Sequence, residues 1–425
     1  MTERDPGAAR RAPLDARAMR QGNLALVLGA VVRHPSISQP ELVEVTGLKK
    51  PTVSKLLDEL MRLGWVRPSG AAAGLVGRPR VLFGPDPERG VVLSARISVD
   101  SISLLVVDFG GAERGRRSRP MDVSAAAQDT VAATLSELAD SLLSEVGAAD
   151  GSVLGAALAL SGIVDGGRLG YAPGLQWADR DATALLRAAL GARLAADAPL
   201  VVGNEARLAA VGEQRYGAAA GVDDFVYLLG ETGVGAGVVV DGRLFRGARG
   251  AAGEVGHVSI AMDGRRCSCG KIGCWAAYVG QSELVRLVGQ ARDAGRASVL
   301  WPSGHGLSAR DSRSEDALTP SAVLRAAQQG DTVAVEALGV LRRYLAAGIG
   351  NLVSVYDPEL VVLGGFLDTA FGHDLAALRA EVDDWVMGGG VHTALRLEAS
   401  RIEEAPLWGG ISLVHDHLVE APRPS

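Results

Sequence analysis

Apolar residues near the start of the chain recur every three to four positions and predict three helices, over residues 23–34, 39–46 and 50–63. Ser38 can cap the second helix, because its side chain can bond a free backbone group there. Gly47 supplies a tight turn before the third helix, as in a helix-turn-helix unit. The residues expected to face the core of this unit are Leu24, Leu28, Val31 or Val32, Leu42, Val45, Val53, Leu56, Leu57 and Leu60.

Two short apolar runs follow the third helix, at residues 65–67 and 81–83, and predict two strands. Segment 68–79 between them is rich in glycine and alanine and is expected to form the wing of a winged helix-turn-helix domain. The N-terminal end of the third helix meets bases and phosphates in such domains, and a wing arginine can enter a narrow minor groove. The residues expected to contact DNA are Lys49, Lys50, Thr52, Ser54, Lys55, Arg78 and Arg80. A helical protein-interaction module with a solvated basic face is the alternative.

The rest of the chain alternates apolar strands with amphipathic helices and predicts an α/β body. Residues 91–97, 102–108 and 153–160 are mostly apolar, which is typical of buried strands. Residues 130–143 have the pattern of an amphipathic helix, and residues 405–417 are expected to form the terminal helix. The predicted fold class is therefore α/β, with a winged helix-turn-helix domain at the N-terminus.

Length and charge divide the chain further. With 425 residues it is too long for one compact core, so two or three domains are expected. Residues 1–90 hold 14 Lys and Arg against 9 Asp and Glu, a net charge of +5, and the remainder holds 29 against 40, a net charge of −11. A basic head on an acidic body indicates that the head alone meets a polyanion. The N-terminus is polar and no apolar run has the length of a membrane span, so we expect a cytoplasmic protein associated with the nucleoid.

All three cysteines of the chain lie close to a histidine, in the spacing H-x9-C-x-C-x4-C. One imidazole and three thiolates form the Cys₃His set that suits a tetrahedral zinc ion, and the cytoplasm keeps thiols reduced. The expected ligands are His257, Cys267, Cys269 and Cys274. Four protein ligands leave no open position for a water molecule, so the ion is expected to be structural. Buried free cysteines or a disulfide are the alternatives.

The pattern E-x-G-H followed by C-x-C-G-x-x-G-C resembles the ROK family of sugar kinases and sugar-responsive repressors. The resemblance runs from about Gly22 to the end of the chain, and it implies an actin-like body of two α/β lobes. The predicted organisation is a flexible tail over residues 1–20, a winged helix-turn-helix domain over 21–84, a linker over 85–90, lobe one over 91–200, and lobe two over 201–425 with a zinc knot over 257–274 and a C-terminal helix that can return to lobe one.

The resemblance also implies where an effector sugar would bind. The family's zinc-binding histidine contacts a sugar hydroxyl through its other ring nitrogen, and a nearby glutamate makes a further contact; these roles correspond to His257 and Glu254. The family's kinases have an Asn-Asp pair, with the aspartate as general base, where this chain has Asn204 and Glu205. Repressor members often carry Asn-Glu, so both residues are expected to contact the effector. The alternative for Glu205 is a purely structural role, in which its carboxylate favours the N-terminal dipole of its helix.

Several positions depart from the kinase pattern of the family. Arg96 and Ser98 stand where the kinases have the aspartate and glycine of their D-x-G-x-T phosphate turn. Phosphoryl transfer depends on positioning and electrostatics, so we expect no kinase activity and assign no catalytic residue. Gly174 replaces an asparagine and Ala276 a glutamate near the expected sugar site, and Trp177 can either stack on a sugar or pack internally.

These features predict a sugar-responsive transcriptional regulator, expected to repress genes of carbohydrate uptake or catabolism. Its expected partners are a double-stranded DNA operator, a sugar or sugar derivative, and further copies of the chain in a dimer or a dimer of dimers. Its expected cofactor is a structural Zn²⁺ ion. One alternative is a ROK sugar kinase with an appended DNA-binding head. The other is a DNA-binding regulator that has lost sugar binding, which Gly174 and Ala276 favour.

Overall fold

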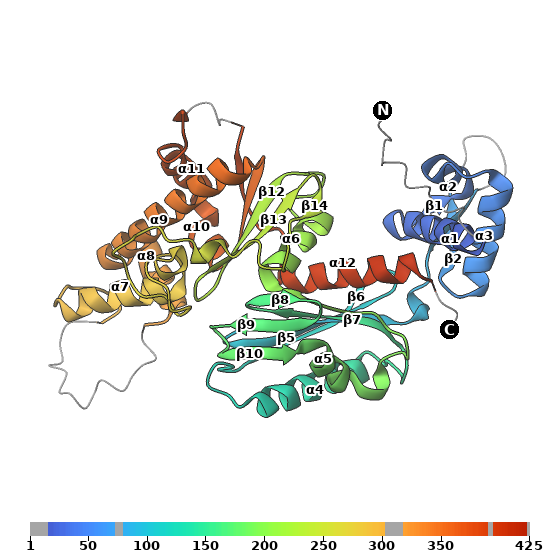
Figure 1. The fold of residues 1–425 in the computed structure, drawn as a ribbon, viewed down its shortest axis with the longest axis horizontal. Helices are drawn as coiled ribbons and strands as arrows, with labels where there is room; N and C mark the ends of the chain where they lie inside the picture. Colours follow the sequence, from blue (N-terminus) through green and yellow to red (C-terminus); the bar gives the residue numbers. More distant parts are fainter. Residues whose placement is uncertain (1–15, 73–79, 302–317, 390–393, 423–425) are drawn as a thin grey trace, which may run out of the picture.

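The computed structural model describes residues 16–72, 80–301, 318–389 and 394–422. A small head and a two-lobed body are joined by a C-terminal helix, α12 (Ala405–Glu420), which lies between them (Figure 1). Helices and strands alternate through the body and a winged helix domain precedes it, so the predicted fold class is confirmed. Among the described residues, no helix has both the length and the apolar character needed to cross a bilayer.

The head is a three-helix unit with a small sheet, as the apolar pattern predicts. Ser38 lies directly before α2, and its backbone N–H and its hydroxyl both donate to the Glu41 carboxylate, over 2.8 and 2.6 Å. Gly47 ends α2 with a φ of 68°, the left-handed conformation that lets the chain turn sharply into α3. The elements are α1 (Ala16–Arg33), β1 (Ile37–Ser38), α2 (Gln39–Thr46), α3 (Lys50–Arg62), β2 (Val66–Ala72) and β3 (Arg80–Pro85), with strand order β1-β3-β2.

Two details of the head differ from the prediction. Helix α1 begins at Ala16, so residues 16–20 are helical rather than part of a flexible tail. Alanine and arginine favour helix there, and Arg20 forms an ion pair of 2.9 Å with Glu59 of α3. Val45, expected in the core, is 52% exposed, because the short helix α2 buries only Leu42 against its neighbours.

Lobe one is built on a five-stranded sheet with the order β11-β7-β4-β5-β6. Strand β4 lies at its centre, parallel to β7 and antiparallel to β5, and helices α4 and α5 pack on one face (Figure 1). Strand β11 completes this sheet through Asn204, so lobe one extends past residue 200. The elements are β4 (Val91–Ile97), β5 (Ser101–Asp108), β6 (Glu113–Pro120), α4 (Gln128–Glu145), β7 (Val153–Leu160), β8 (Ile163–Asp165), β9 (Arg168–Ala172), β10 (Trp177–Asp181), α5 (Ala182–Leu190) and β11 (Leu200–Asn204).

Lobe two has a second five-stranded sheet, with the order β14-β13-β12-β15-β16. Its core is closed by α9, whose apolar residues pack against those of β12, β13 and β15. The elements are α6 (Glu205–Tyr216), β12 (Phe225–Gly230), β13 (Val234–Val240), β14 (Arg243–Leu244), α7 (Gln281–Asp293), α8 (Pro320–Gln328), α9 (Thr332–Tyr356), β15 (Leu360–Gly365), α10 (Phe366–Phe371), α11 (Leu375–Asp383) and β16 (Arg396–Ala399).

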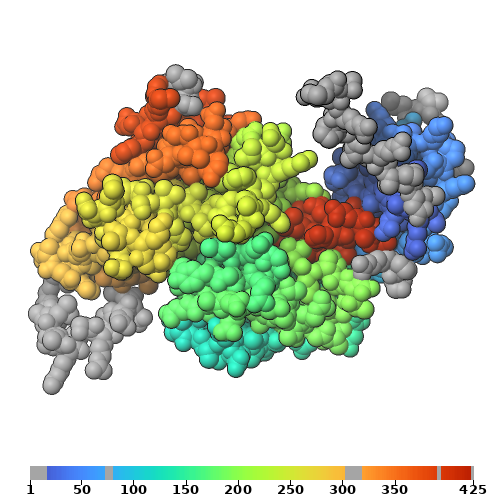
Figure 2. Space-filling view, in the orientation of Figure 1, coloured from blue at the N-terminus to red at the C-terminus, as the bar shows by residue number. Residues whose placement is uncertain are grey.

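Helix α12 returns to lobe one and also reaches the head. It packs against α6, β4 and β7 in the body and against α1 in the head. Its buried residues form one continuous apolar cluster with residues of α1, α3, β4 and β5; the members from α12 are Leu407, Ile411, Val414 and Leu418. Figure 2 shows the surface of α12 between the head and the two lobes. The head is therefore not a separate core on a tether.

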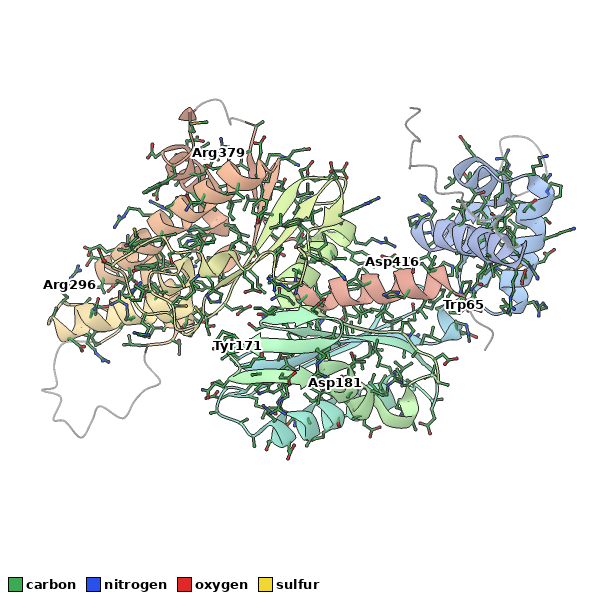
Figure 3. The ribbon with its side chains drawn as sticks, viewed as in Figure 1. Trp65, Tyr171, Asp181, Arg296, Arg379 and Asp416 are labelled. Carbon is green, nitrogen blue, oxygen red and sulfur yellow. The ribbon has the colours of Figure 1, made fainter. Side chains whose placement is uncertain are left out.

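Aromatic rings reinforce the junction between head and body (Figure 3 labels Trp65 there). Trp65 is buried and meets Phe109 edge-on, with ring centroids 4.9 Å apart, and Phe109 meets His415 of α12 at 5.7 Å. Burial lowers the pKa of His415 to about 4, so this imidazole is neutral at pH 7. The segment expected as a linker is ordered, because Arg89 stacks on the Trp65 ring at 4.4 Å.

Candidate functional site

The N-terminal end of α3 carries the basic surface predicted to meet DNA. Lys49, Lys50 and Lys55 are exposed, and Thr52 and Ser54 are half-buried beside them. The first turn of α3 contains no acidic residue that would neutralise these charges. Three ammonium groups thus lie where a recognition helix meets the backbone and bases of DNA.

Of the wing, the structure describes the two strands at its base, β2 and β3. Arg80 is exposed at the start of β3 and pairs in register with Ala72 of β2. Arg78 lies outside the described residues. Strand β2 extends to Ala72, so the strands of the wing are longer than the apolar runs indicate.

The predicted metal ligands come together at the loop after β14. The ligand atoms of His257, Cys267, Cys269 and Cys274 all lie within 4.8 Å of one another. Nδ1 of His257 is 3.6 Å from Sγ of Cys267, and Sγ of Cys269 is 3.7 Å from Sγ of Cys274. Zinc–sulfur bonds of about 2.3 Å give a tetrahedron with edges of about 3.8 Å. The spacing and the N/S donor set therefore fit a zinc ion.

The protonation of these ligands bears on how a cation would bind. Burial, hydrogen bonding with Cys269 and the charge of Cys267 raise the pKa of Cys274 to about 12, so a metal ion would have to displace its proton, whereas hydrogen bonds from neighbouring groups lower the pKa of Cys267. Burial and the charge of Lys271 lower the pKa of His257, which keeps the imidazole in the neutral form that binds metals. A divalent cation at this position would stabilise the thiolates.

A cavity of about 760 Å³ lies beside the metal cluster, between residues of the two lobes. This size suits a small organic ligand. Its lining includes every residue predicted to contact the effector: Asn204, Glu205, Glu254 and His257. Tyr171, on the β9 strand of lobe one, also lines it (Figure 3). The structure thus brings together, in one cavity, residues from segments that are distant in the sequence.

Asn204 and Glu205 sit where β11 passes into α6. Asn204 caps α6, since its Oδ1 accepts from the backbone N–H of Arg207 at 3.1 Å, and its Nδ2 donates to the carbonyl of Gly162 at 3.0 Å. Its amide is thus largely engaged in shaping the cavity wall. Glu205 is buried, and its Oε2 accepts from Arg96 at 2.9 Å. Its second oxygen, Oε1, is available to accept from a ligand hydroxyl.

Glu254 and His257 lie at either end of one short 3₁₀ turn. The backbone N–H of His257 donates to the carbonyl of Glu254 over 3.1 Å, which fixes their spacing. Burial raises the pKa of Glu254, Arg207 opposes that rise, and Glu205 adds to it. Nδ1 of His257 faces the thiols, so Nε2 is the nitrogen left for a ligand.

Arg96 forms an ionic cluster that the sequence analysis did not foresee. Its three nitrogens Nε, Nη2 and Nη1 donate to Glu205, Glu231 and Glu404 over 2.9, 2.9 and 3.2 Å. Burial disfavours the charged guanidinium, but attraction from the three carboxylates holds the pKa of Arg96 well above its usual value. A charged residue in a strand that is mostly apolar needs buried counter-charges, and this was a signal that such partners exist, although it did not identify them.

Two further sets of residues modify the predicted site. Trp177 is 5% exposed and packs in the core of lobe one, which supports internal packing rather than sugar stacking. Glu283 is buried in the cavity wall and binds both Arg265 and Arg286. Nothing in the sequence pattern distinguished Glu283 and Arg286 from an ordinary polar helix face, or Arg265 from the other polar residues of its loop.

Residues 93–417 match the model described as the ROK family, and residues 24–73 match the one described as the MarR family. The chain belongs to the ROK family. A Xylose repressor of Caldicellulosiruptor bescii is 27% identical over 412 residues, which cover 95% of this chain and 98% of that protein. The structure of a ROK family transcriptional regulator, a homolog of the E. coli MLC protein, shares the fold, with a TM-score of 0.75 and 24% identity over 95% of this chain and 97% of that one.

A ROK family glucokinase from Streptomyces griseus, solved with glucose and AMPPNP, has a TM-score of 0.64 and 28% identity. The match covers 76% of this chain and 99% of the glucokinase. In the ROK body described here, the turn between β4 and β5 is bonded to itself: the Ser98 hydroxyl donates to Asp100 over 2.6 Å, and the Ser98 backbone N–H donates to the carbonyl of Ser101 over 3.0 Å. The Asp100 carboxylate lines the cavity.

Proposed function

We propose that this protein is a transcriptional repressor whose affinity for DNA is controlled by a sugar bound in the ROK body. The observation that carries this proposal is the continuous core in which the winged head, lobe one and α12 are packed together. A ligand that alters the body can therefore alter the head directly. The ROK and MarR matches and the similarity to a Xylose repressor over almost the whole chain support the same function.

The cavity favours a neutral sugar over a phosphorylated one. Four of its acidic lining residues are suited to accept from hydroxyl groups and repel phosphate; they are Asp100, Glu205, Glu231 and Glu254. The basic residues of the lining are already engaged: Arg265 and Arg286 bind Glu283, and Arg266 and Lys271 donate to backbone carbonyls. Because a relative is named Xylose repressor, D-xylose is the first candidate for the effector.

A structural Zn²⁺ ion held by His257 and the three cysteines would orient the sugar contacts. The ion would fix His257 with Nε2 toward the cavity, and the adjoining 3₁₀ turn would then set the position of Glu254. Asn204 and Glu205 would hold the opposite side of the sugar. Ala276 also lines the cavity, where its methyl group contributes no hydrogen bond.

We infer that the body does not transfer phosphate. A guanidinium and three carboxylates occupy the interlobe position where the family's kinases use an aspartate for metal and phosphate, and the surplus negative charge there repels a nucleotide. The kinase alternative is tested by a coupled ADP-release assay over a panel of sugars. Turnover near 1 s⁻¹, low in the usual range for enzymes, would establish the kinase.

We further propose that two chains associate, so that two heads meet a pseudo-palindromic operator. Lys49, Lys50, Thr52, Ser54 and Lys55 of α3 would enter the major groove. Arg78 and Arg80 of the wing would approach the minor groove. Selection of bound fragments from genomic DNA provides the operator for the measurements below.

Lys55→Ala and Arg80→Ala are each expected to weaken operator binding about tenfold. The slope of the logarithm of affinity against the logarithm of salt concentration should become shallower by about one for each phosphate contact that is lost. Fluorescence anisotropy at several salt concentrations measures both. Arg62→Ala is the matched control, since Arg62 is exposed on α3 at the end away from the expected DNA surface. An equal loss in all three variants would contradict the assigned surface.

A further inference from the structure

Two helices, α6 and α12, begin at glutamates bound by Arg96 and run through the body in backbone contact. Helix α6 begins with Glu205, and α12 begins directly after Glu404. A Cβ at Gly409 of α12 would lie 1.7 Å from the carbonyl oxygen of Leu208 in α6. A Cβ at Gly212 of α6 would lie 2.5 Å from the carbonyl oxygen of Ala405. Packing this close couples the two helices, so a shift of one displaces the other.

Arg96 holds the N-terminal ends of both helices. The same guanidinium bonds Glu205 at the start of α6, Glu404 before α12, and Glu231 in the turn between β12 and β13 of lobe two. Its side chain is 9% exposed, so these bonds are shielded from solvent. Arg96 does not itself line the cavity, whereas Glu205 and Glu231 do. Arg96 is thus placed to respond to a ligand in the cavity through Glu205 and Glu231 rather than by direct contact.

This cluster is unevenly charged and partly strained. One cation faces three carboxylates, and burial together with repulsion from Glu205 raises the pKa of Glu231 to about 7 against the attraction of Arg96. Glu404 has a φ of 55°, a left-handed conformation that costs free energy for any residue other than glycine. Its ion pair with Arg96 favours this conformation at the first turn of α12. A change in the cluster therefore has a direct consequence for how α12 begins.

The far end of α12 lies against the head. Leu418 of α12 shares a buried cluster with Leu24 and Leu28 of α1. A Cβ at Gly29 of α1 would lie only 3.1 Å from Val419. A displacement of α12 along or about its axis must therefore move α1 and the recognition helix that packs on it.

We propose that Arg96 is the positioning residue that converts occupancy of the cavity into a position of α12 and hence of the DNA-binding head. A ligand hydroxyl that donates to the free oxygen of Glu205, Oε1, takes up part of that carboxylate's negative charge and so weakens its bond to Arg96 through Oε2. The guanidinium is then held chiefly by Glu231 and Glu404, and the paired ends of α6 and α12 shift together. The inference deepens the proposed function and rests on it only for the identity of the ligand.

Hydrogen exchange measured by mass spectrometry on the full chain, without DNA or sugar, tests this directly. Arg96→Met keeps the length of the side chain but removes its charge, and we expect at least tenfold faster exchange in the first turns of α12 and in α1. Arg96→Lys, which retains the charge, should restore part of the protection. If Arg96→Met does not fold, Glu404→Gln removes only the carboxylate before α12 and should give the same pattern in α12 and α1.

Arg116→Met is the matched control. Arg116 pairs with Glu403, the neighbour of Glu404, at 3.0 Å, but this pair is on the surface and Glu403 is 83% exposed. We expect exchange in α12 and α1 to be unchanged by it. Equal effects of Arg116→Met and Glu404→Gln, or an effect of Glu404→Gln that stops short of α1, would overturn the proposal.

A second measurement distinguishes two roles of the Arg96 cluster: transmitting the effect of a bound sugar to α1, and only stabilising the fold. D-xylose is expected to change exchange in α1 of the wild type, and Glu404→Gln should abolish that change while D-xylose still raises the melting temperature. Retention of the α1 response in Glu404→Gln would overturn the role given to this cluster. A wild type that does not respond to D-xylose would count against the proposed effector, and the ligand-free exchange would still decide the role of Arg96.

Discussion

Cys269→Ser is expected to release the metal ion and to lower the melting temperature by on the order of 10 °C. A serine hydroxyl is a poor ligand for zinc, and structural zinc sites in small peptides contribute about 10–16 kcal/mol, of which one ligand in four carries a substantial part. The loop that holds His257 and Glu254 would lose its anchor, so the response to sugar should also disappear. Metal content per chain and differential scanning calorimetry measure the two effects.

Ser268→Ala is the control for this substitution, because Ser268 is an exposed neighbour of Cys269 that is not one of the four clustered ligands. It should retain one zinc per chain and the melting temperature of the wild type. A wild-type protein that carries no zinc, or a Cys269→Ser variant with unchanged metal content, would contradict the assigned metal site.

Trp65→Ala is expected to lower the free energy of unfolding by about 3–5 kcal/mol and to weaken operator binding. Trp65 is 2% exposed, its ring packs on Phe109 of lobe one, and Arg89 stacks on it. The cavity left by the indole would open the junction, so the head would lose the orientation that α12 and lobe one impose. Urea denaturation and anisotropy with the selected operator measure the two consequences.

Trp385→Ala is the matched control, since Trp385 is 57% exposed in lobe two and contributes little buried area. We expect its unfolding free energy to change by much less than that of Trp65→Ala, and its operator affinity to remain unchanged. If Trp65→Ala lost stability but kept full affinity for the operator, the junction would support folding without orienting the head.

The head and the metal cluster could be predicted from the sequence because their signals are local. Apolar spacing defines α1, α2 and α3, and the four metal ligands fall within a short stretch around His257 and Cys274. The start of α1 was misplaced, because the ion pair between Arg20 and Glu59 comes from the tertiary structure. Local sequence patterns therefore predicted which elements form more accurately than they predicted where each element begins and ends.

The cluster around Arg96 could not be predicted in the same way. Its partners lie at positions 205, 231 and 404, in three different parts of the chain, and only the fold brings them together. The sequence showed that a kinase aspartate was replaced but gave no indication of what the arginine would bind. Trp177 is a second case, because an aromatic residue near a sugar site has the same local pattern whether it stacks on ligand or packs in a core.

The affinity of the full chain for its selected operator, with and without saturating sugar, tests the central claim most directly. Coupling between two sites is typically 5- to 150-fold, so we expect D-xylose, or another neutral sugar of the panel, to change the dissociation constant by at least about fivefold. A dissociation constant that stays the same with every sugar, including one shown to bind by a rise in melting temperature, would contradict the claim that the ROK body controls the head.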